Sequence, residues 1–142
     1  MKTLNPRAKT LVDLWLASER LSARIDHNLG SVHGIGYVEF MVLYQLARCP
    51  DLRMRRVDLA TAIGRTASGV TRLLKPMENT GFIARDSSDR DARVSLVTLT
   101  SAGQIRLEEA LTTMNGLGQR LTQALGDSQL DSAASALAIL RD

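Results

Sequence analysis

Apolar residues recur at three- and four-residue steps along most of the chain, and this pattern predicts a mainly helical protein. A long amphipathic helix is expected over about residues 8–28. A second helix is expected over residues 37–47, where little polar surface interrupts the apolar residues. This second helix is therefore predicted to be buried.

The last third of the chain has the same helical pattern. Ser101 and Gln104 match a capping box, so a long helix is predicted to begin there, and Gly126-Asp127 is expected to end it. A final short helix is expected from Leu130 to Leu140. Its apolar residues have no obvious partner within so small a domain.

Between Arg55 and Gly103 the pattern changes from helical to alternating. A short helix is predicted from Val57 to Gly64, because glycine is common just beyond a helix C-terminus. Thr66 has the position of an N-cap for the next helix, whose apolar stripe would face the core. The stripe consists of Val70, Leu73, Leu74 and Met77.

Two short strands are predicted after this helix, over residues 82–85 and 94–99, joined by a polar loop over residues 86–93. Helix, turn, helix and hairpin follow one another in the order of a DNA-reading winged helix-turn-helix. The predicted fold class is mainly α with a small β-wing, in a single domain over residues 1–142. Residues 37–100 form its winged helix-turn-helix region.

The exposed face of the second helix of this motif carries candidate DNA-binding side chains. They are hydrogen-bond donors that lie opposite the apolar stripe or at the start of the helix, where they can reach phosphates or base edges. An ordinary solvated helix face would have the same pattern, so the helix alone leaves both interpretations open. The candidates are Arg65, Thr66, Ser68, Thr71, Arg72 and Lys75.

The loop of the hairpin adds a second candidate contact. Arg90 and Arg93 at its tip are long enough to enter a minor groove, whose negative potential favours guanidinium groups. Asp89 and Asp91 are expected to pair with nearby Arg side chains and orient them, because a carboxylate that faces phosphate is repelled. A solvated hairpin tip of mixed charge is the alternative interpretation.

Taken together, these residues resemble the MarR family of winged helix-turn-helix transcription regulators, over nearly the whole chain. Two positions depart from the family pattern. Gly69 stands where a small Ser, Thr, Asn or Ala is usual, and Ala92 replaces a usual basic residue and so removes one phosphate contact. The residues at the family's spacing are Leu59-Ala60, Gly64, Val70-Thr71-Arg72, Met77-Glu78, Gly81-Phe82-Ile83, Asp91, Arg93, Thr100 and Gly103.

The resemblance implies a homodimer built from the terminal helices, over residues 8–35 and 101–142. Their apolar residues also require a covering chain, although a monomer with a few exposed Leu side chains is the alternative. Two-fold symmetry then places two recognition helices about one DNA turn apart, roughly 34 Å, and predicts a pseudo-palindromic operator. The expected function is sequence-specific transcriptional regulation on double-stranded DNA, with repression the commoner outcome in the family.

The family often has an effector cleft where the dimer helices meet the DNA-binding region, and ligand binding there changes the spacing of the recognition helices. A small aromatic or phenolic effector is therefore a candidate partner, since Arg or His beside aromatic rings could hold an aromatic carboxylate. Plain core packing and surface charge would explain the same residues. The candidates are Trp15, Arg24, His33, Tyr37, Met41 and Tyr44.

Composition and charge agree with these predictions. The 142 residues are 44% hydrophobic and 23% charged, which is an ordinary globular balance. The net charge is +3, and residues 53–100 contain nine Arg or Lys against five Asp or Glu. Because this excess on the DNA-binding region is modest, affinity is expected to need two subunits acting together.

The N-terminus has no secretory signal pattern, since its apolar stretch is short and is interrupted by Asp13. No run approaches the roughly 20 apolar residues of a membrane span. The single Cys cannot form an internal disulfide, which suits a reducing compartment. A cytoplasmic protein without a membrane partner is expected.

Cys49 is the remaining chemical candidate. A thiol-based redox sensor is an alternative function, with Arg48 and Arg53 as neighbours that could lower the pKa of the thiol. A small apolar residue at a helix end is the simpler interpretation. Two His and one Cys fall short of a zinc site, so no metal or other cofactor is expected.

An enzyme is not expected, because the chain has no nucleophile elbow, phosphate loop, Cys-x-x-Cys or His-Glu-x-x-His motif. The alternative from another class is a winged helix that serves as a protein-interaction module. Such a module would bind DNA weakly and without sequence preference. A regulator would instead prefer its operator by roughly 10³-fold or more.

Overall fold

The computed structural model describes residues 3–87 and 95–141. It confirms the predicted fold class of a mainly helical chain with a small antiparallel wing. The elements in chain order are α1 (Pro6–His33), α2 (Tyr37–Ala47), β1 (Arg53–Arg55), α3 (Arg56–Ala62), α4 (Ala67–Asn79), β2 (Ile83–Ser87), β3 (Ser95–Leu99), α5 (Ser101–Thr122) and α6 (Asp127–Arg141).

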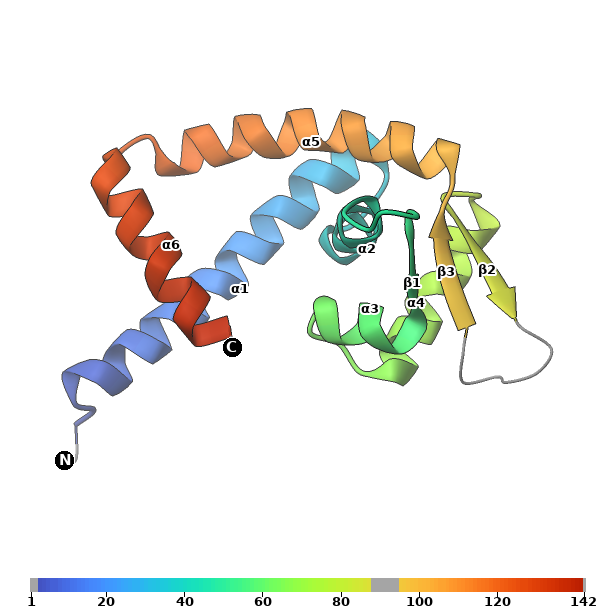
Figure 1. Ribbon diagram of the computed structural model, residues 1–142. Coiled ribbons are helices and arrows are strands. Elements are labelled where there is room, and N and C mark those ends of the chain that lie inside the picture. The colour runs from blue at the N-terminus through green and yellow to red at the C-terminus, as the bar shows by residue number, and fades with distance from the viewer. Residues whose placement is uncertain (1–2, 88–94, 142) are drawn as a thin grey trace.

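The elements form a winged part, which consists of α3, α4 and the three strands, and a helical arm, which consists of α1, α5 and α6 (Figure 1). α5 runs along one edge of the molecule with α1 packed against it, and α2 lies between this pair and the winged part. α6 turns back from the far end of α5 toward α1 (Figure 1). Within the described residues, no helix is both long and apolar enough to cross a membrane.

The hydrophobic core lies around α2, as its apolar sequence predicts. Val42, Leu43 and Leu46 of this helix are fully buried, and α2 packs against α1, α3, α5 and the sheet. From α1, only Ile25 and Leu29 in its C-terminal half are buried. The N-terminal half of α1 and all the described residues of α6 contribute no buried residue. The arm therefore has apolar side chains that this chain alone does not cover.

Helix α1 is longer than the predicted 8–28. Its N-terminus begins at Pro6, because the Asn5 side chain accepts the backbone N–H of Ala8 at 2.9 Å and Pro is favoured in the first helical turn. Its C-terminus continues to His33 and ends at Gly34, whose φ of 65° is the left-handed conformation that glycine adopts readily. The 37–47 prediction for α2 is confirmed.

Both predicted ends of α5 need correction. The N-cap is Thr100 and not Ser101, since the Thr100 side chain accepts the backbone N–H of Gly103 at 3.1 Å. The helix ends at Thr122, before the predicted Gly126-Asp127. Gly126 instead precedes α6, where the Gln129 side chain accepts its backbone N–H at 2.9 Å as in a capping box.

The sheet has three antiparallel strands in the order β1-β3-β2. β1 was not predicted, because its three residues form a strand only by pairing with β3, where Met54 lies opposite Val97. β2 begins at Ile83 and not at Phe82, and its pairing with β3 runs on to Ser87 opposite Ser95. The residue predicted to begin the last strand, at position 94, lies outside the described residues.

Candidate nucleic-acid interface

The turn between α3 and α4 has the geometry of a helix-turn-helix. Gly64, just beyond α3, has a φ of 64°, so the chain reverses there at little steric cost. Thr66 then caps α4 by accepting the backbone N–H of Gly69 at 3.1 Å, as predicted. Both helices bury their apolar sides, with Leu59 of α3 and Val70 of α4 fully buried. The helix that follows the turn, α4, is the candidate recognition helix.

The outward face of α4 carries the predicted polar residues. Ser68, Arg72 and Lys75 are exposed on this helix, and Arg65 and Thr66 are exposed in the turn before it. Their hydrogen-bond donors therefore face solvent. All five side chains are exposed, as the sequence predicted for a binding face.

Thr71, the remaining candidate on α4, already has a partner within the chain. Arg56, at the start of α3, donates from Nη1 to the Thr71 hydroxyl at 2.5 Å and to the Ala67 carbonyl at 3.2 Å. The Thr71 hydroxyl in turn donates to that carbonyl at 3.0 Å. Arg56 therefore joins the two helices on their exposed side. Arg56 was not among the residues predicted from the sequence, where its only signal is a basic residue directly before an apolar helical run.

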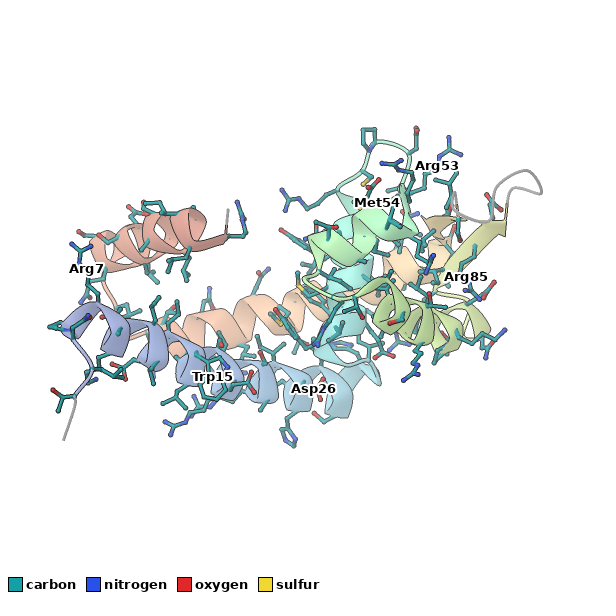
Figure 2. All side chains as sticks on the ribbon, turned by 90° about the horizontal axis from the view of Figure 1, so that it is seen from below. Arg7, Trp15, Asp26, Arg53, Met54 and Arg85 are labelled. Carbon is teal, nitrogen blue, oxygen red and sulfur yellow. The ribbon has the colours of Figure 1, made fainter. Side chains whose placement is uncertain are left out.

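Further cations lie on β1, beside α3. Arg53 and Arg55 are exposed there, and Figure 2 shows Arg53 and Met54 at the winged end of the molecule. Arg55 donates to both carboxylate oxygens of Asp58, at 2.7 and 3.1 Å. This hydrogen bonding, together with the charge of Asp58, raises the pKa of the Arg55 guanidinium above its usual value. Arg55 is therefore held in an exposed ion pair with Asp58.

The wing is tied to α4 by a half-buried ion pair. Arg85 of β2 donates to Oε2 of Glu78, in the last turn of α4, from Nε at 2.8 Å and from Nη2 at 2.5 Å. Figure 2 shows Arg85 on the side of the winged part where α4 lies. A carboxylate near a helix C-terminus is electrostatically unfavourable by itself, and the guanidinium offsets this. The predicted wing residues Asp89, Arg90, Asp91 and Arg93 lie outside the described residues.

The six candidate effector residues are spread over separate places. Trp15 is 61% exposed and lines a shallow apolar hollow with Leu137 and Leu140 of α6. Tyr37 lines a different hollow, shared with Asp26 of α1 and Arg65 of the turn. Figure 2 shows the separation along the arm, with Trp15 toward one end of α1 and Asp26 toward the winged part.

The other four effector candidates have local roles. Met41 and Tyr44 pack against the core, and the Tyr44 ring stacks on Phe40 with 5.9 Å between the ring centroids. The His33 ring is hydrogen-bonded through Nε2 to the Thr113 hydroxyl at 2.7 Å. Arg24 is exposed on α1. The structure therefore places Tyr37, but not the whole set, beside the helix-turn-helix.

Cys49 follows α2, and its surroundings are polar. The half-buried thiol donates to the Gln45 carbonyl at 3.6 Å and lines a hollow with Arg48 and Arg141. Arg53, the other neighbour expected from the sequence, is paired with Asp51 at 3.7 Å. In the part of the chain that the structure describes, no group of three or more His, Cys, Asp or Glu side chains is arranged to hold a metal ion.

Comparison with known proteins matches this geometry to one family. A family model described as the MarR family matches residues 35–95, from the end of α1 to the start of β3. The transcriptional repressor MprA of Escherichia coli (strain K12) is 30% identical over 98 residues, which are 69% of this chain and 56% of MprA. The chain belongs to the MarR family. It spans little more than half the length of MprA, and the transcriptional regulators of this family are not enzymes.

Solved structures share the fold over almost the entire chain. Sco3205 from Streptomyces coelicolor, in complex with DNA, superposes with a TM-score of 0.84 at 22% identity, covering 99% of this chain and 89% of Sco3205. NadR in complex with 4-hydroxyphenylacetate gives a TM-score of 0.80 at 22% identity, covering 100% of this chain and 99% of NadR. At this identity the likeness shows a common fold that includes the arm and α6.

Proposed function

We propose that this chain is a sequence-specific DNA-binding transcriptional regulator, with α4 as the helix that enters the major groove. The observation that carries the proposal is the exposed polar face of α4, with Ser68, Arg72 and Lys75 directed outward from a helix-turn-helix whose apolar side is buried. Arg and Lys are the side chains that most often contact guanine edges and phosphates. The DNA complex of Sco3205, which has the same fold, supports this assignment.

The wing supplies a second contact in this proposal. Arg90 and Arg93 enter the neighbouring minor groove, and Asp89 and Asp91 orient nearby Arg side chains. The described parts of β2 and β3 support this, because the Glu78 pair to β2 holds the wing against the last turn of α4. The major-groove contact of α4 and the minor-groove contact of the wing then come from one rigid unit. Repression is the proposed outcome, as in the relative MprA, which is a transcriptional repressor.

The proposed active form is a homodimer joined through the arm. Trp15 on α1 and Leu137, Ile139 and Leu140 on α6 are all at least half exposed in the single chain. A second copy would cover them, which supports dimerisation through α1, α5 and α6. The two α4 helices would then lie about one DNA turn apart, roughly 34 Å, on a pseudo-palindromic operator.

A small aromatic or phenolic effector is proposed as the signal that releases DNA. The hollow lined by Tyr37, Asp26 and Arg65 lies between the arm and the start of α4. A ligand in this hollow would contact Arg65, one of the proposed DNA-binding residues, and the Glu19 and Asp26 carboxylates beside it can accept a phenolic hydroxyl, which supports this place for the effector. NadR, bound to 4-hydroxyphenylacetate, has the same fold. Release of operator DNA by that compound, measured by mobility shift, would test this part separately.

The experiment that tests the main proposal is a mobility shift with fragments from beside the protein's own gene, with excess competitor DNA and at two salt concentrations. A shift that resists competitor supports the proposal and defines the operator. Equal affinity for all fragments, with strong salt dependence, would contradict it and favour an interaction module, because phosphate contacts alone give salt-sensitive binding without sequence preference.

A further inference from the structure

The turn that follows the candidate recognition helix is contacted by one face of α5. This contact face consists of Thr100, Gly103 and Arg106, which are spaced three residues apart and so lie along one side of the helix. The Thr100 hydroxyl donates to the Gly81 carbonyl at 2.5 Å, and the Thr100 backbone N–H donates to the Phe82 carbonyl at 3.2 Å.

Gly103 permits the closest approach within the contact face. A Cβ atom at this position would lie 2.1 Å from the Phe82 carbonyl oxygen and 2.7 Å from Cδ1 of Leu99. The backbone of α5 therefore lies directly on the turn. This turn is also bonded to α4, because the Phe82 backbone N–H donates to the Met77 carbonyl at 3.0 Å.

Arg106 extends this contact face to the end of α1. Its Cζ atom lies 5.3 Å from the centroid of the Phe82 ring, within the range of a cation–π interaction. Its Nη1 donates to the backbone carbonyl of His33, the last residue of α1, at 2.6 Å. That carbonyl is one of the four at a helix C-terminus that have no partner inside the helix, and the positive charge also suits the negative end of the helix dipole.

The Arg106 guanidinium is half-buried and has one further charged neighbour. Its side chain is 31% exposed, and the Glu109 carboxylate lies 3.7 Å from Nε. Nε is itself buried without a hydrogen-bond partner among the described residues, so desolvation of this atom is an uncompensated cost. A second bond joins α1 and α5 beside it, between His33 Nε2 and the Thr113 hydroxyl. The end of α1, the start of α5 and the turn after α4 therefore meet at one side chain.

We propose that Arg106 is a positioning residue that holds the end of α1 against the turn after α4, and so sets the orientation of the recognition helix relative to the arm. A lysine could bond the His33 carbonyl, but it lacks the planar group that lies over Phe82 at the same time. In the proposed homodimer the two chains are joined through their arms, so the orientation of α4 relative to the arm sets the distance between the two α4 helices. The consequence for DNA, which rests on the proposed function, is that Arg106 fixes the half-site spacing that the dimer accepts.

The test measures this orientation directly, without DNA. Spin labels are attached at Arg20→Cys on α1 and Asn79→Cys on α4, two exposed positions, in a Cys49→Ser background. Labelled chain is diluted with excess unlabelled chain, so that only distances within one chain are measured. Arg106→Ala is expected to broaden the distance distribution and shift its mean, whereas Arg120→Ala, an exposed position on the same helix, leaves it unchanged.

An unchanged distribution in a folded Arg106→Ala protein, with its circular dichroism and thermal midpoint retained, would overturn the proposal. If Arg106→Ala does not fold, Arg106→Met decides in the same way, because it retains an unbranched apolar stem but removes both the donor to the His33 carbonyl and the cation over Phe82. The second readout is operator DNA whose half-sites are moved by one base pair, about 3.4 Å. Wild type is expected to lose affinity on such DNA, and Arg106→Ala to lose less. A wild type without any operator preference would refute the proposed function, while the label distances would still test Arg106.

Discussion

Replacement of Gly103 by alanine tests the packing of α5 on the turn after α4. In an ordinary helix interior, alanine is more favourable than glycine by about 0.8–1 kcal/mol. At this position the new Cβ would lie 2.1 Å from the Phe82 carbonyl oxygen, whereas ordinary contacts of this kind are about 3.3 Å or longer. The helix or the turn must therefore move by roughly 1 Å.

The expected cost follows from that movement. Overpacking of a close contact typically costs about 1–3 kcal/mol, and loss of the bond from Thr100 to the Phe82 carbonyl would add about 1 kcal/mol. After the helix propensity of alanine is subtracted, Gly103→Ala is expected to lower the free energy of unfolding by about 2 kcal/mol. The matched control is Gly118→Ala on the same helix, where an added Cβ meets no atom within 4 Å.

The assay is urea denaturation of the three proteins at one fixed concentration, because the stability of a dimer depends on concentration. Gly118→Ala is expected to be as stable as wild type, or more stable by up to about 1 kcal/mol. A Gly103→Ala protein that gains stability as the control does would refute the close approach of α5 to Phe82.

Four further predictions concern the caps, the wing, the dimer and the DNA contact. Thr100→Ala should lower the free energy of unfolding by about 1–2 kcal/mol in the same denaturation assay, because α5 loses its N-cap and the bond to the turn. A double-mutant cycle with Glu78→Gln and Arg85→Gln should give a coupling free energy of about 1 kcal/mol, and a value near zero would mean that the ion pair does not hold the wing. Leu137→Asp should raise the dimer dissociation constant, measured by analytical ultracentrifugation, at least about tenfold; an unchanged constant would exclude the hollow of α1 and α6 from the interface. Arg93→Ala should weaken operator binding about tenfold without a change in the thermal midpoint, and unchanged affinity at physiological salt would refute the wing contact.

Most of the helices could be predicted from the sequence, because their signals are local. The apolar run of α2, the glycine after α3 and the Thr66 cap each depend on residues within a few positions of one another. Helix ends were less certain, since adjacent hydroxyl residues compete for the same cap. Thr100 caps α5 instead of Ser101, and its additional bond to the Gly81 carbonyl, 19 residues away, is a contact that no local pattern contains.

Apart from helix ends, the parts that the sequence did not predict depend on pairing between distant residues. β1 exists only because Met54 lies opposite Val97 of β3. Arg56 and Arg85 were not singled out, because each acts through a residue on another element, 15 and 7 positions away. The effector candidates were chosen by residue chemistry and not by position. They share aromatic and basic chemistry, but Trp15 and other members are distributed over separate places along the arm.

Whether the exposed face of α4 reads DNA sequence is tested most directly with Arg72→Ala. The measurement is the ratio of affinities for the operator and for a scrambled duplex of the same length, at one salt concentration, for wild type and variant. Loss of a base contact should reduce this ratio about 10- to 100-fold while circular dichroism and the unfolding midpoint stay unchanged. A folded Arg72→Ala protein that retains the wild-type ratio would contradict the assignment of α4 as the recognition helix.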